Sequence, residues 1–418
     1  MTVTDREVLR ALETFGDAVY LVDRATFTDN VTRFRAAFQS RYERTNLGYS
    51  VKTNYLPYFC LTASALGCYA EVVSEMEYAL VRALGIPGER IIVNGPYKPA
   101  SFLWRALEEG AVVNLDAPYE LAALEERASS TERSGRTWRL GIRCNVEIGG
   151  ARVSRFGFDA EAGAAKPVAA RARALPGVDL VALHAHVCTS ERSVAEYGEL
   201  ADKLLGVADD LFGEGAPEML NLGGGFFSEM PEAMRASFKG RIPTFDEYGE
   251  ALGARMANRY GRSGPELVLE PGLAILATAM HFACVVLDVK SLGARTIVSM
   301  SGSIYDIKPT KSRRRLPMRV IRRNLGQEVT CRGADLAGYT CMEDDLLYEG
   351  YDGPIAAGDV VVFDNVGAYT VVLKPPFIET CAPVVAYDEA SGTFEVLKRE
   401  ETDSDVFATF AMDAGARR

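Results

Sequence analysis

Between residues 18 and 275, short apolar segments alternate with longer segments of helical periodicity. Repeated strand–helix units of this kind predict parallel strands that are joined by right-handed crossovers. About eight units fit into this length, and that number favours a closed (β/α)8 barrel over an open sheet. The segments that we interpret as strands are 18–22, 47–51, 69–74, 90–95, 111–116, 139–146, 180–187, 218–226 and 266–272.

The segments between these strands have the spacing of helices. In the helix predicted over 74–85, Met76, Leu80 and Leu84 recur at intervals of four residues. Gly85 then predicts the C-terminal end of this helix. Segments 117–128 and 193–215 predict two further helices in the same way.

The pattern changes after residue 276. Segments 281–300, 351–366 and 382–399 are strand-like and are interrupted by Gly, Pro and Asp, which is typical of an antiparallel β-domain. We therefore predict an α/β chain of three parts. These are an N-terminal segment that packs with the β-domain (1–26), a TIM-like barrel (27–275) and a C-terminal antiparallel β-domain (276–418).

Charge and composition argue against several classes of protein. A net charge of −11 disfavours a nucleic-acid partner, and no apolar run approaches the length of a membrane span. The eight cysteines are scattered without a CxxC pair, so we expect reduced thiols in a cytoplasmic protein. Because the chain has only three histidines, we expect no metal site.

Polar residues end or follow several of the predicted barrel strands. In a barrel of this type the active site lies at the C-terminal ends of the strands. Each such residue alone has an ordinary explanation, such as a surface lysine, a packed histidine or a tight glycine turn. Their joint placement favours a common site. The residues are Lys52, Glu71, Arg143, His186, Gly223, Gly224, Gly225 and Glu270.

Three of these features together indicate pyridoxal 5′-phosphate. Backbone N–H groups of the turn Gly223–Gly225 can approach a phosphate closely, because no side chain intervenes. The amine of Lys52 can form an imine with the cofactor aldehyde, and Glu270 can partner the pyridine nitrogen. A protonated ring draws electrons from the substrate α-carbon, which favours loss of CO2.

Seven motifs occur in the order seen in fold-type III pyridoxal-phosphate decarboxylases. They are YSVKTN, the segment 70–98, LHAHVCTS, LNLGGGF, LEPG, TCMEDDLL and NVGAYT. Over residues 18–385 the chain resembles the group of diaminopimelate, ornithine and arginine decarboxylases, with alanine racemase as a more distant relative.

The resemblance implies roles for the barrel residues. Lys52 is similar to the lysine that forms the imine with the cofactor, His186 to the imidazole that stacks on the ring, and Glu270 to the partner of the ring nitrogen. The remaining cofactor-binding residues implied by the resemblance are Glu71 and Arg143 near the imine and the ring substituents, Thr189 and Gly223–Gly225 at the phosphate, and Tyr369 in the pocket wall.

The resemblance also implies a homodimer with shared active sites. Cys341 and Asp345 are similar to the cysteine and the acid that reach into the partner subunit's site. Cys341 would return a proton to the α-carbon after CO2 leaves. Glu343 would meet the distal end of the substrate, although it is displaced by one position from the usual glutamate.

Two departures from the family pattern concern the phosphate and the substrate. Leu273 stands where the family has a phosphate-binding arginine. Together with the displaced Glu343, this disfavours meso-diaminopimelate and makes the chain resemble decarboxylases of siderophore and other specialised pathways.

The run 308–323 carries eight basic residues and no acid. It is either a solvated loop or a site, including Arg313, for an anionic substrate such as a carboxylated conjugate, a phosphate or a carrier-protein thioester.

We therefore predict a pyridoxal-phosphate-dependent α-decarboxylase of an amino acid or an amino-acid conjugate. One alternative is an amino-acid racemase or epimerase of the same fold. Glu270 argues against it, since such racemases commonly place a cation at the ring nitrogen. The other alternative is a non-catalytic pyridoxal-phosphate-binding protein, which the β-domain disfavours.

Overall fold

The structure, a computed structural model, describes residues 3–128, 135–149, 154–186, 189–236, 238, 240–262, 264–311, 314–323 and 329–411. The chain divides into two compact units. The barrel unit comprises 28–229 and 238–275, and the β unit comprises 1–27, 230–237 and 276–418. The segment 230–237 groups with the β unit, which the sequence did not predict; the predicted domain boundaries stay a proposal.

Within the described residues, eight parallel strands close into a barrel. Closure is complete because β5 pairs with β6 at one point of the ring and β10 pairs with β2 at another. The strands are β2 (Thr45–Ser50), β3 (Tyr69–Val72), β4 (Ile91–Val93), β5 (Val112–Leu115), β6 (Trp138–Asn145), β8 (Val178–His184), β9 (Met219–Gly224) and β10 (Glu266–Glu270), with the short β7 (Phe158–Asp159) beside β6. This confirms the predicted barrel.

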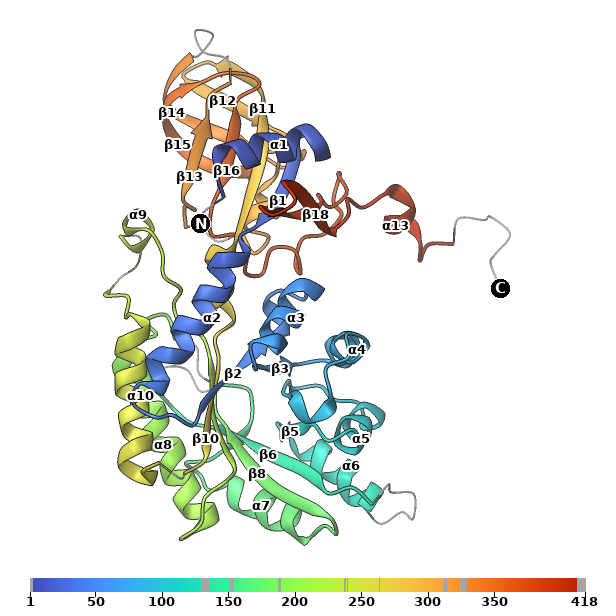
Figure 1. Ribbon diagram of the computed structural model, residues 1–418, viewed down its shortest axis with the longest axis vertical. Helices are drawn as coiled ribbons and strands as arrows, with labels where there is room; N and C mark the ends of the chain where they lie inside the picture. Colours follow the sequence, from blue (N-terminus) through green and yellow to red (C-terminus); the bar gives the residue numbers. More distant parts are fainter. Residues whose placement is uncertain are drawn as a thin grey trace. The chain divides into compact units, whose positions relative to one another are not determined.

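Helices alternate with these strands and surround the barrel (Figure 1). They are α2 (Arg24–Gln39), α3 (Pro57–Ala65), α4 (Glu75–Ala83), α5 (Ala100–Glu108), α6 (Pro118–Ala128), α7 (Ala165–Ala174), α8 (Val194–Phe212), α10 (Phe245–Tyr260) and α11 (Gly272–Leu276), with 3-10 turns η1 (Val51–Thr53) and η2 (Gly88–Arg90). Two of the long helices begin with capping boxes, Ser193 with Glu196 and Thr244 with Glu247. No helix in the described ranges combines the length and apolarity needed to cross a bilayer.

The helix predicted over 74–85 forms as α4, but its buried face differs from the predicted pattern. Gly85 has a φ of +83° and follows the end of the helix as expected. Met76 is 64% exposed, whereas Tyr78 and Val81 are buried. The short helix turns its aromatic residue inward, where Tyr78 contacts Phe102 of α5. The four-residue spacing alone therefore does not identify the face that packs on the barrel.

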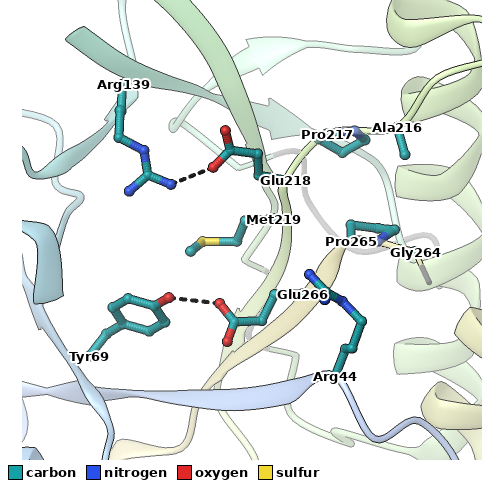
Figure 2. A pocket seen from close by; sticks show the side chains of 10 residues that line it. All are labelled: Arg44, Tyr69, Arg139, Ala216, Pro217, Glu218, Met219, Gly264, Pro265 and Glu266. Carbon is teal, nitrogen blue, oxygen red and sulfur yellow. Dashed lines mark hydrogen bonds and ion pairs between the residues drawn. The ribbon is translucent and has the colours of Figure 1, made fainter. Parts of the chain in front are cut away.

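The N-terminal ends of the barrel strands border a pocket of about 530 Å³ (Figure 2). Arg139 at the start of β6 donates to Glu218 at 2.6 Å, and Tyr69 at the start of β3 donates to Glu266 at 2.8 Å. Each pair skips one strand, since β8 lies between β6 and β9 and β2 lies between β3 and β10. The two pairs therefore tie the strands together at the end that is structural in barrels of this type.

In the β unit, the described strands form a mostly antiparallel sheet in the order β15-β14-β12-β11-β1-β17-β18, with β16 beside β11 and β13 beside β16. The pairs β1–β17 and β12–β14 are parallel. The strands are β1 (Ala18–Val22), β11 (Met280–Leu292), β12 (Arg295–Met300), β13 (Met318–Ile321), β14 (Val329–Ala337), β15 (Leu346–Ile355), β16 (Val360–Phe363), β17 (Val384–Asp388) and β18 (Thr393–Lys398). The predicted antiparallel domain is confirmed.

Helix α1 (Asp5–Phe15) belongs to the β unit, as do the short helical segments α9 (Glu232–Arg235), η3 (Ala277–Ala279), α12 (Ile304–Ile307) and α13 (Asp403–Phe407). The segment 18–22, which we counted among the barrel strands and also placed in the N-terminal segment that packs with the β-domain, forms strand β1 of the β unit. It pairs antiparallel with β11, with Ala18 opposite Cys284. Its Val19 and Leu21 pack in a hydrophobic core with residues of α1 and β16. The apolar residues of this strand are therefore buried in the sheet of the β unit and not in the barrel.

Candidate active site

A cavity of about 230 Å³ lies at the C-terminal ends of the barrel strands. The structure brings five of the predicted residues to its wall: Lys52, Glu71, Arg143, His186 and Glu270. The other lining residues are Val73, Asn94, Gly95, Pro96, Phe156 and His184. All of them belong to the barrel unit.

Lys52 lies in the turn η1, directly after β2. Its ammonium forms an ion pair with Glu71 of β3 and donates to the hydroxyl of Ser50 at 3.3 Å. The same Glu71 oxygen, Oε2, accepts from Ser50 at 2.6 Å. The Lys52 side chain is 31% exposed whereas Glu71 is buried, so a fixed carboxylate orients an accessible amine.

Glu270 ends β10 and is buried. Its Oε1 accepts from Asn94 at 2.8 Å and from Asn221 at 2.7 Å, and its Oε2 lies 3.6 Å from Nε2 of His184. Burial alone would raise the pKa of Glu270, but the neighbouring imidazole of His184 and the ammonium of Lys52 outweigh burial and hold the pKa well below its usual range. Glu270 therefore presents a permanent negative charge to the cavity.

His186 follows β8 and carries a neutral ring. The backbone N–H of Gly224 donates to Nδ1 of His186 at 2.9 Å, which requires that this nitrogen is unprotonated. Burial, followed by the charges of Lys52 and Arg143, lowers the pKa of His186 to about 3, although Glu270 opposes the shift. The flat, uncharged imidazole suits stacking on an aromatic cofactor.

The glycine turn at the end of β9 leaves no space for side chains on its inner side. Gly223 has a φ of +66° and Gly225 a φ of +92°, conformations that favour glycine. A Cβ at Gly223 would lie 2.6 Å from Nδ1 of His186, and one at Gly224 would collide with the backbone oxygen of Glu270. The three glycines do not line the cavity, and the N–H groups of Gly223 and Gly224 donate to Asn221 and His186, so the assignment of the turn to the phosphate stays a prediction.

Arg143 of β6 is buried beside Phe156 and pairs with Asp116 at 3.1 Å. The loop of Asp116 is itself fixed, because its backbone N–H donates to Glu120 at 2.7 Å. Glu120 forms an ion pair of 2.9 Å with Lys98, and both side chains are fully buried. Arg143 thus reaches the cavity from a rigid support.

Thr189 does not line this cavity. Its hydroxyl donates to Glu196 at 2.8 Å and accepts from the backbone N–H of Arg192, within the N-terminal turn of α8. Its assignment to the phosphate stays a prediction. Leu273, the departure from the family arginine, lies in α11.

The remaining predicted site residues belong to the β unit. Cys341 and Glu343 are exposed on the segment between β14 and β15. Tyr369 is 36% exposed and has a φ of +60°, a strained backbone for a residue with a large side chain. Arg313 lies outside the described residues.

Asp345 differs from its predicted role as an acid that reaches outward. It is buried, and its carboxylate accepts from the Ser303 hydroxyl at 3.0 Å, from the Ile304 N–H at 2.7 Å and from the Thr340 N–H at 3.0 Å. These bonds fix the loop within the β unit and leave little capacity for a substrate.

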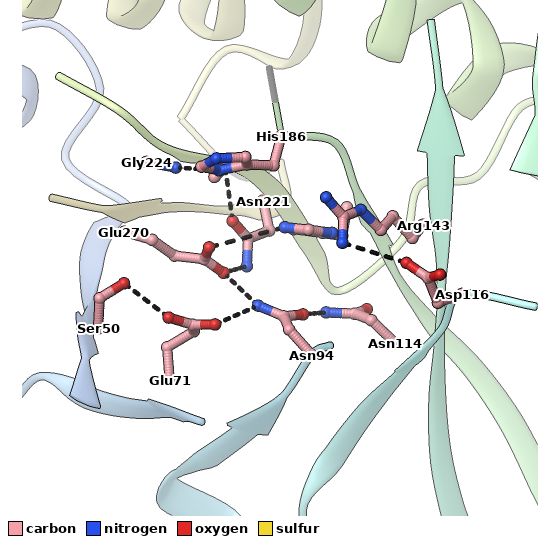
Figure 3. Close-up of polar contacts among 12 residues, drawn as sticks. Ser50, Glu71, Asn94, Asn114, Asp116, Arg143, His186, Asn221, Gly224 and Glu270 are labelled. Carbon is pink, nitrogen blue, oxygen red and sulfur yellow. Dashed lines mark hydrogen bonds and ion pairs between the residues drawn. The ribbon is translucent and has the colours of Figure 1, made fainter. Parts of the chain in front are cut away.

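Sequence reasoning missed the amides that connect the charged residues (Figure 3). Asn94 follows β4, Asn114 lies in β5 and Asn221 lies in β9, so strand position would have identified them. The prediction was limited to charged, nucleophilic and glycine residues at the strand ends. An amide side chain is neutral and was therefore not selected, although it can donate to two carboxylates.

The fold and the cavity define a class of protein. A lysine amine beside an ionised carboxylate and a neutral imidazole, at the C-terminal mouth of a (β/α)8 barrel, is an arrangement that fits pyridoxal 5′-phosphate.

Comparison with known proteins identifies the family. Residues 26–277 match the family described as "Pyridoxal-dependent decarboxylase, pyridoxal binding domain", and the chain belongs to this family. It is a pyridoxal-phosphate-dependent carboxy-lyase, which confirms the predicted cofactor and enzyme class.

Individual relatives cover nearly the whole chain. The diaminopimelate decarboxylase of Methanocaldococcus jannaschii is 24% identical, over 96% of this chain and 93% of the relative. That of Bacillus subtilis is 26% identical, over 99% of this chain and 95% of the relative.

Solved structures share the fold. The crystal structure of the M. jannaschii diaminopimelate decarboxylase superposes with a TM-score of 0.84 at 22% identity, covering 97% of this chain and 94% of that one. A lysine decarboxylase from Selenomonas ruminantium gives 0.74 at 20% identity, covering 93% of this chain and 97% of that one.

Proposed function

We propose that this enzyme releases the α-carboxylate of a diamino acid as CO2, in a site centred on Lys52 and Glu270. The observation that carries the proposal is the placement of an amine and an ionised carboxylate at the wall of one cavity. When bound there, pyridoxal phosphate supplies an electron sink for the bond that breaks.

The chain's own groups would divide the remaining work. Lys52 Nζ would hold the cofactor, with Glu71 Oε2 as the acceptor of its proton. Glu270 would keep a negative charge against the ring nitrogen, and the neutral face of His186 would pack on the ring. The turn Gly223–Gly225, with Arg143, would bind the anionic substituents; because the N–H groups of Gly223 and Gly224 already donate to Asn221 and His186, the N–H of Gly225 is the proposed donor.

Cys341 would return a proton to the α-carbon from the partner subunit, and we propose a homodimer on this basis. The β unit carries exposed apolar residues, which supports an interface: Met342 is 36% exposed, Leu373 50%, Phe377 39% and Ile378 52%. Tyr305 contacts two of them, Met342 through its hydroxyl and Phe377 through its ring. Sedimentation velocity at micromolar concentration tests the dimer, and a monomeric species would contradict it.

Three of the eight basic residues in the run 308–323 are already paired with acids, which weighs against their use in binding an anionic conjugate. Lys311 pairs with Asp344 at 2.7 Å, Arg319 with Asp364 at 3.1 Å and Arg322 with Asp359 at 2.8 Å. These three cations are therefore engaged within the β unit.

The names of the relatives, diaminopimelate decarboxylases, also support a diamino substrate. Leu273 and the displaced Glu343 support a variant substrate of a specialised pathway, rather than meso-diaminopimelate itself.

A CO2-release assay tests the reaction and the substrate. The panel holds meso-diaminopimelate, lysine, ornithine, arginine, acidic amino acids and carboxylated or carrier-linked conjugates, with Lys52→Ala as the inactive control. We expect CO2 release from a diamino acid and none from the control. Loss of optical rotation without CO2 would instead support a racemase, and no turnover of any compound would support a binding protein.

A further inference from the structure

We propose that Asn94 is a positioning residue that bridges the carboxylates of Glu71 and Glu270 and fixes their orientation. Its amide nitrogen Nδ2 donates to Oε1 of Glu71 at 3.0 Å and to Oε1 of Glu270 at 2.8 Å. Figure 3 shows the three side chains pointing toward one another from different strands. The inference rests on the proposed assignment of Lys52 and Glu270 to the cofactor.

The orientation of the Asn94 amide is fixed by its surroundings. Its oxygen Oδ1 accepts from Nδ2 of Asn114 at 2.8 Å, and its backbone N–H donates to the oxygen of Val72 at 2.8 Å. The opposite orientation would turn Oδ1 toward two carboxylates, which have no proton to donate when ionised. Asn94 is buried, so water does not easily replace it.

Two carboxylates that share a buried site repel each other, and one of them normally takes up a proton. An amide offers two N–H groups and no charge, so it can serve both carboxylates at once. A lysine in its place would neutralise one of them. Asn94 therefore lets both carboxylates stay ionised without cancelling either charge.

The bonds of Asn94 also decide which oxygens remain for the cofactor. Each carboxylate uses Oε1 for the amide, so Oε2 of Glu71 is left to Ser50 and Lys52. In Glu270, Oε1 is further held by Asn221, and Oε2 lies 3.6 Å from Nε2 of His184. The amide of Asn94 thus fixes one oxygen of each acid and leaves the other to different partners.

Asn221 extends this chain of contacts to the glycine turn. It is fully buried, and its Oδ1 accepts from the backbone N–H of Gly223 at 2.9 Å. The amine, the carboxylate for the ring nitrogen and the phosphate turn are therefore joined through Asn94 and Asn221. A change at Asn94 will reach both ends of a bound cofactor.

The test measures the affinity of the purified protein for pyridoxal phosphate as a function of pH, by absorbance titration. Asn94→Ala removes the amide donor to Glu270, so this carboxylate binds a proton more readily and the acid limb of the affinity moves up by about one pH unit, a tenfold loss of affinity on that limb. The matched control is Asn30→Ala. Asn30 is as buried as Asn94, at 4% exposure, and donates to the backbone oxygen of Ile275 away from the cavity.

We expect the limb of Asn30→Ala to coincide with that of the unchanged protein. An unshifted limb in Asn94→Ala, or an equal shift in both variants, would overturn the inference. If Asn94→Ala does not fold, the isosteric Asn94→Asp is used: it adds a third acid, and a limb that does not rise overturns the inference equally. Failure of the proposed function is distinguishable, because it appears as no Lys52-dependent CO2 release in the unchanged protein.

Discussion

Single residues of the cavity are held in defined charge states by their neighbours. Glu270 is ionised because an imidazole and an ammonium offset its burial, and His186 is neutral because burial outweighs the nearby carboxylate. The two groups differ in charge although both are enclosed by the same barrel. The contacts of the His186 ring nitrogens and of the Glu270 carboxylate oxygens determine these two charge states.

The charge state of His186 predicts how the cofactor-free protein responds to acid. Its pKa is about 3 in the folded state against 6.5 for the free side chain. Between these values the unfolded chain binds a proton that the folded chain does not, so the free energy of unfolding falls as the pH decreases from 6.5 toward 3. Above pH 6.5 the residue is neutral in both states and contributes no slope.

Urea unfolding at several pH values measures this slope in the unchanged protein and in His186→Gln. We expect a shallower decline in the variant, because the residue that binds the extra proton is gone. Equal slopes in the two proteins would show that His186 is not the neutral group described here.

The sequence alone identified the charged residues of the site but not its amide side chains. Lys52, Glu71, Arg143, His186 and Glu270 follow from one rule, that polar residues at the ends of parallel strands converge. Asn94 obeys the same rule, but its function depends on two acceptors at measured distances, which no spacing in the sequence reveals.

Secondary-structure elements show where pattern and packing diverge. The barrel strands follow from their apolar runs, because strands buried on both faces need continuous hydrophobic sequence. The same property does not distinguish β1 from a barrel strand, because its apolar run is equally buried in the β unit. Asp345 shows what a sequence motif cannot predict in a loop. The motif identifies an acidic residue, but only the tertiary contacts show that its carboxylate accepts hydrogen bonds from Ser303 and Ile304.

The pair Tyr69–Glu266 at the N-terminal mouth predicts a stability effect without an activity effect. Burial and then the charge of Glu266 raise the pKa of Tyr69 to about 12, so the hydroxyl remains a donor at neutral pH. Tyr69→Phe should lower the free energy of unfolding by about 1 kcal/mol, the usual contribution of such a bond. CO2 release should be unchanged, because the cavity lies at the other end of the strands.

Denaturant titration and the CO2 assay are compared for Tyr69→Phe and for Tyr97→Phe, whose side chain is 73% exposed and serves as the control for stability. A Tyr69 variant as stable as the Tyr97 variant would contradict the structural role of this mouth. So would a large loss of activity at unchanged stability.

The whole molecule combines a barrel that carries the cavity with a β unit that carries Cys341 and an exposed apolar surface. Membership of the pyridoxal-dependent decarboxylase family accounts for the barrel, and the solved relatives share the complete two-part fold. The proposed reaction depends on one covalent attachment point for the cofactor, the amine of Lys52.

The most direct test is borohydride reduction of the protein loaded with pyridoxal phosphate, followed by peptide mass mapping. The account predicts one modified residue, Lys52, and loss of the modification in Lys52→Ala with the fold retained. A label on a different lysine, or an unchanged label in the Lys52 variant, would contradict the account.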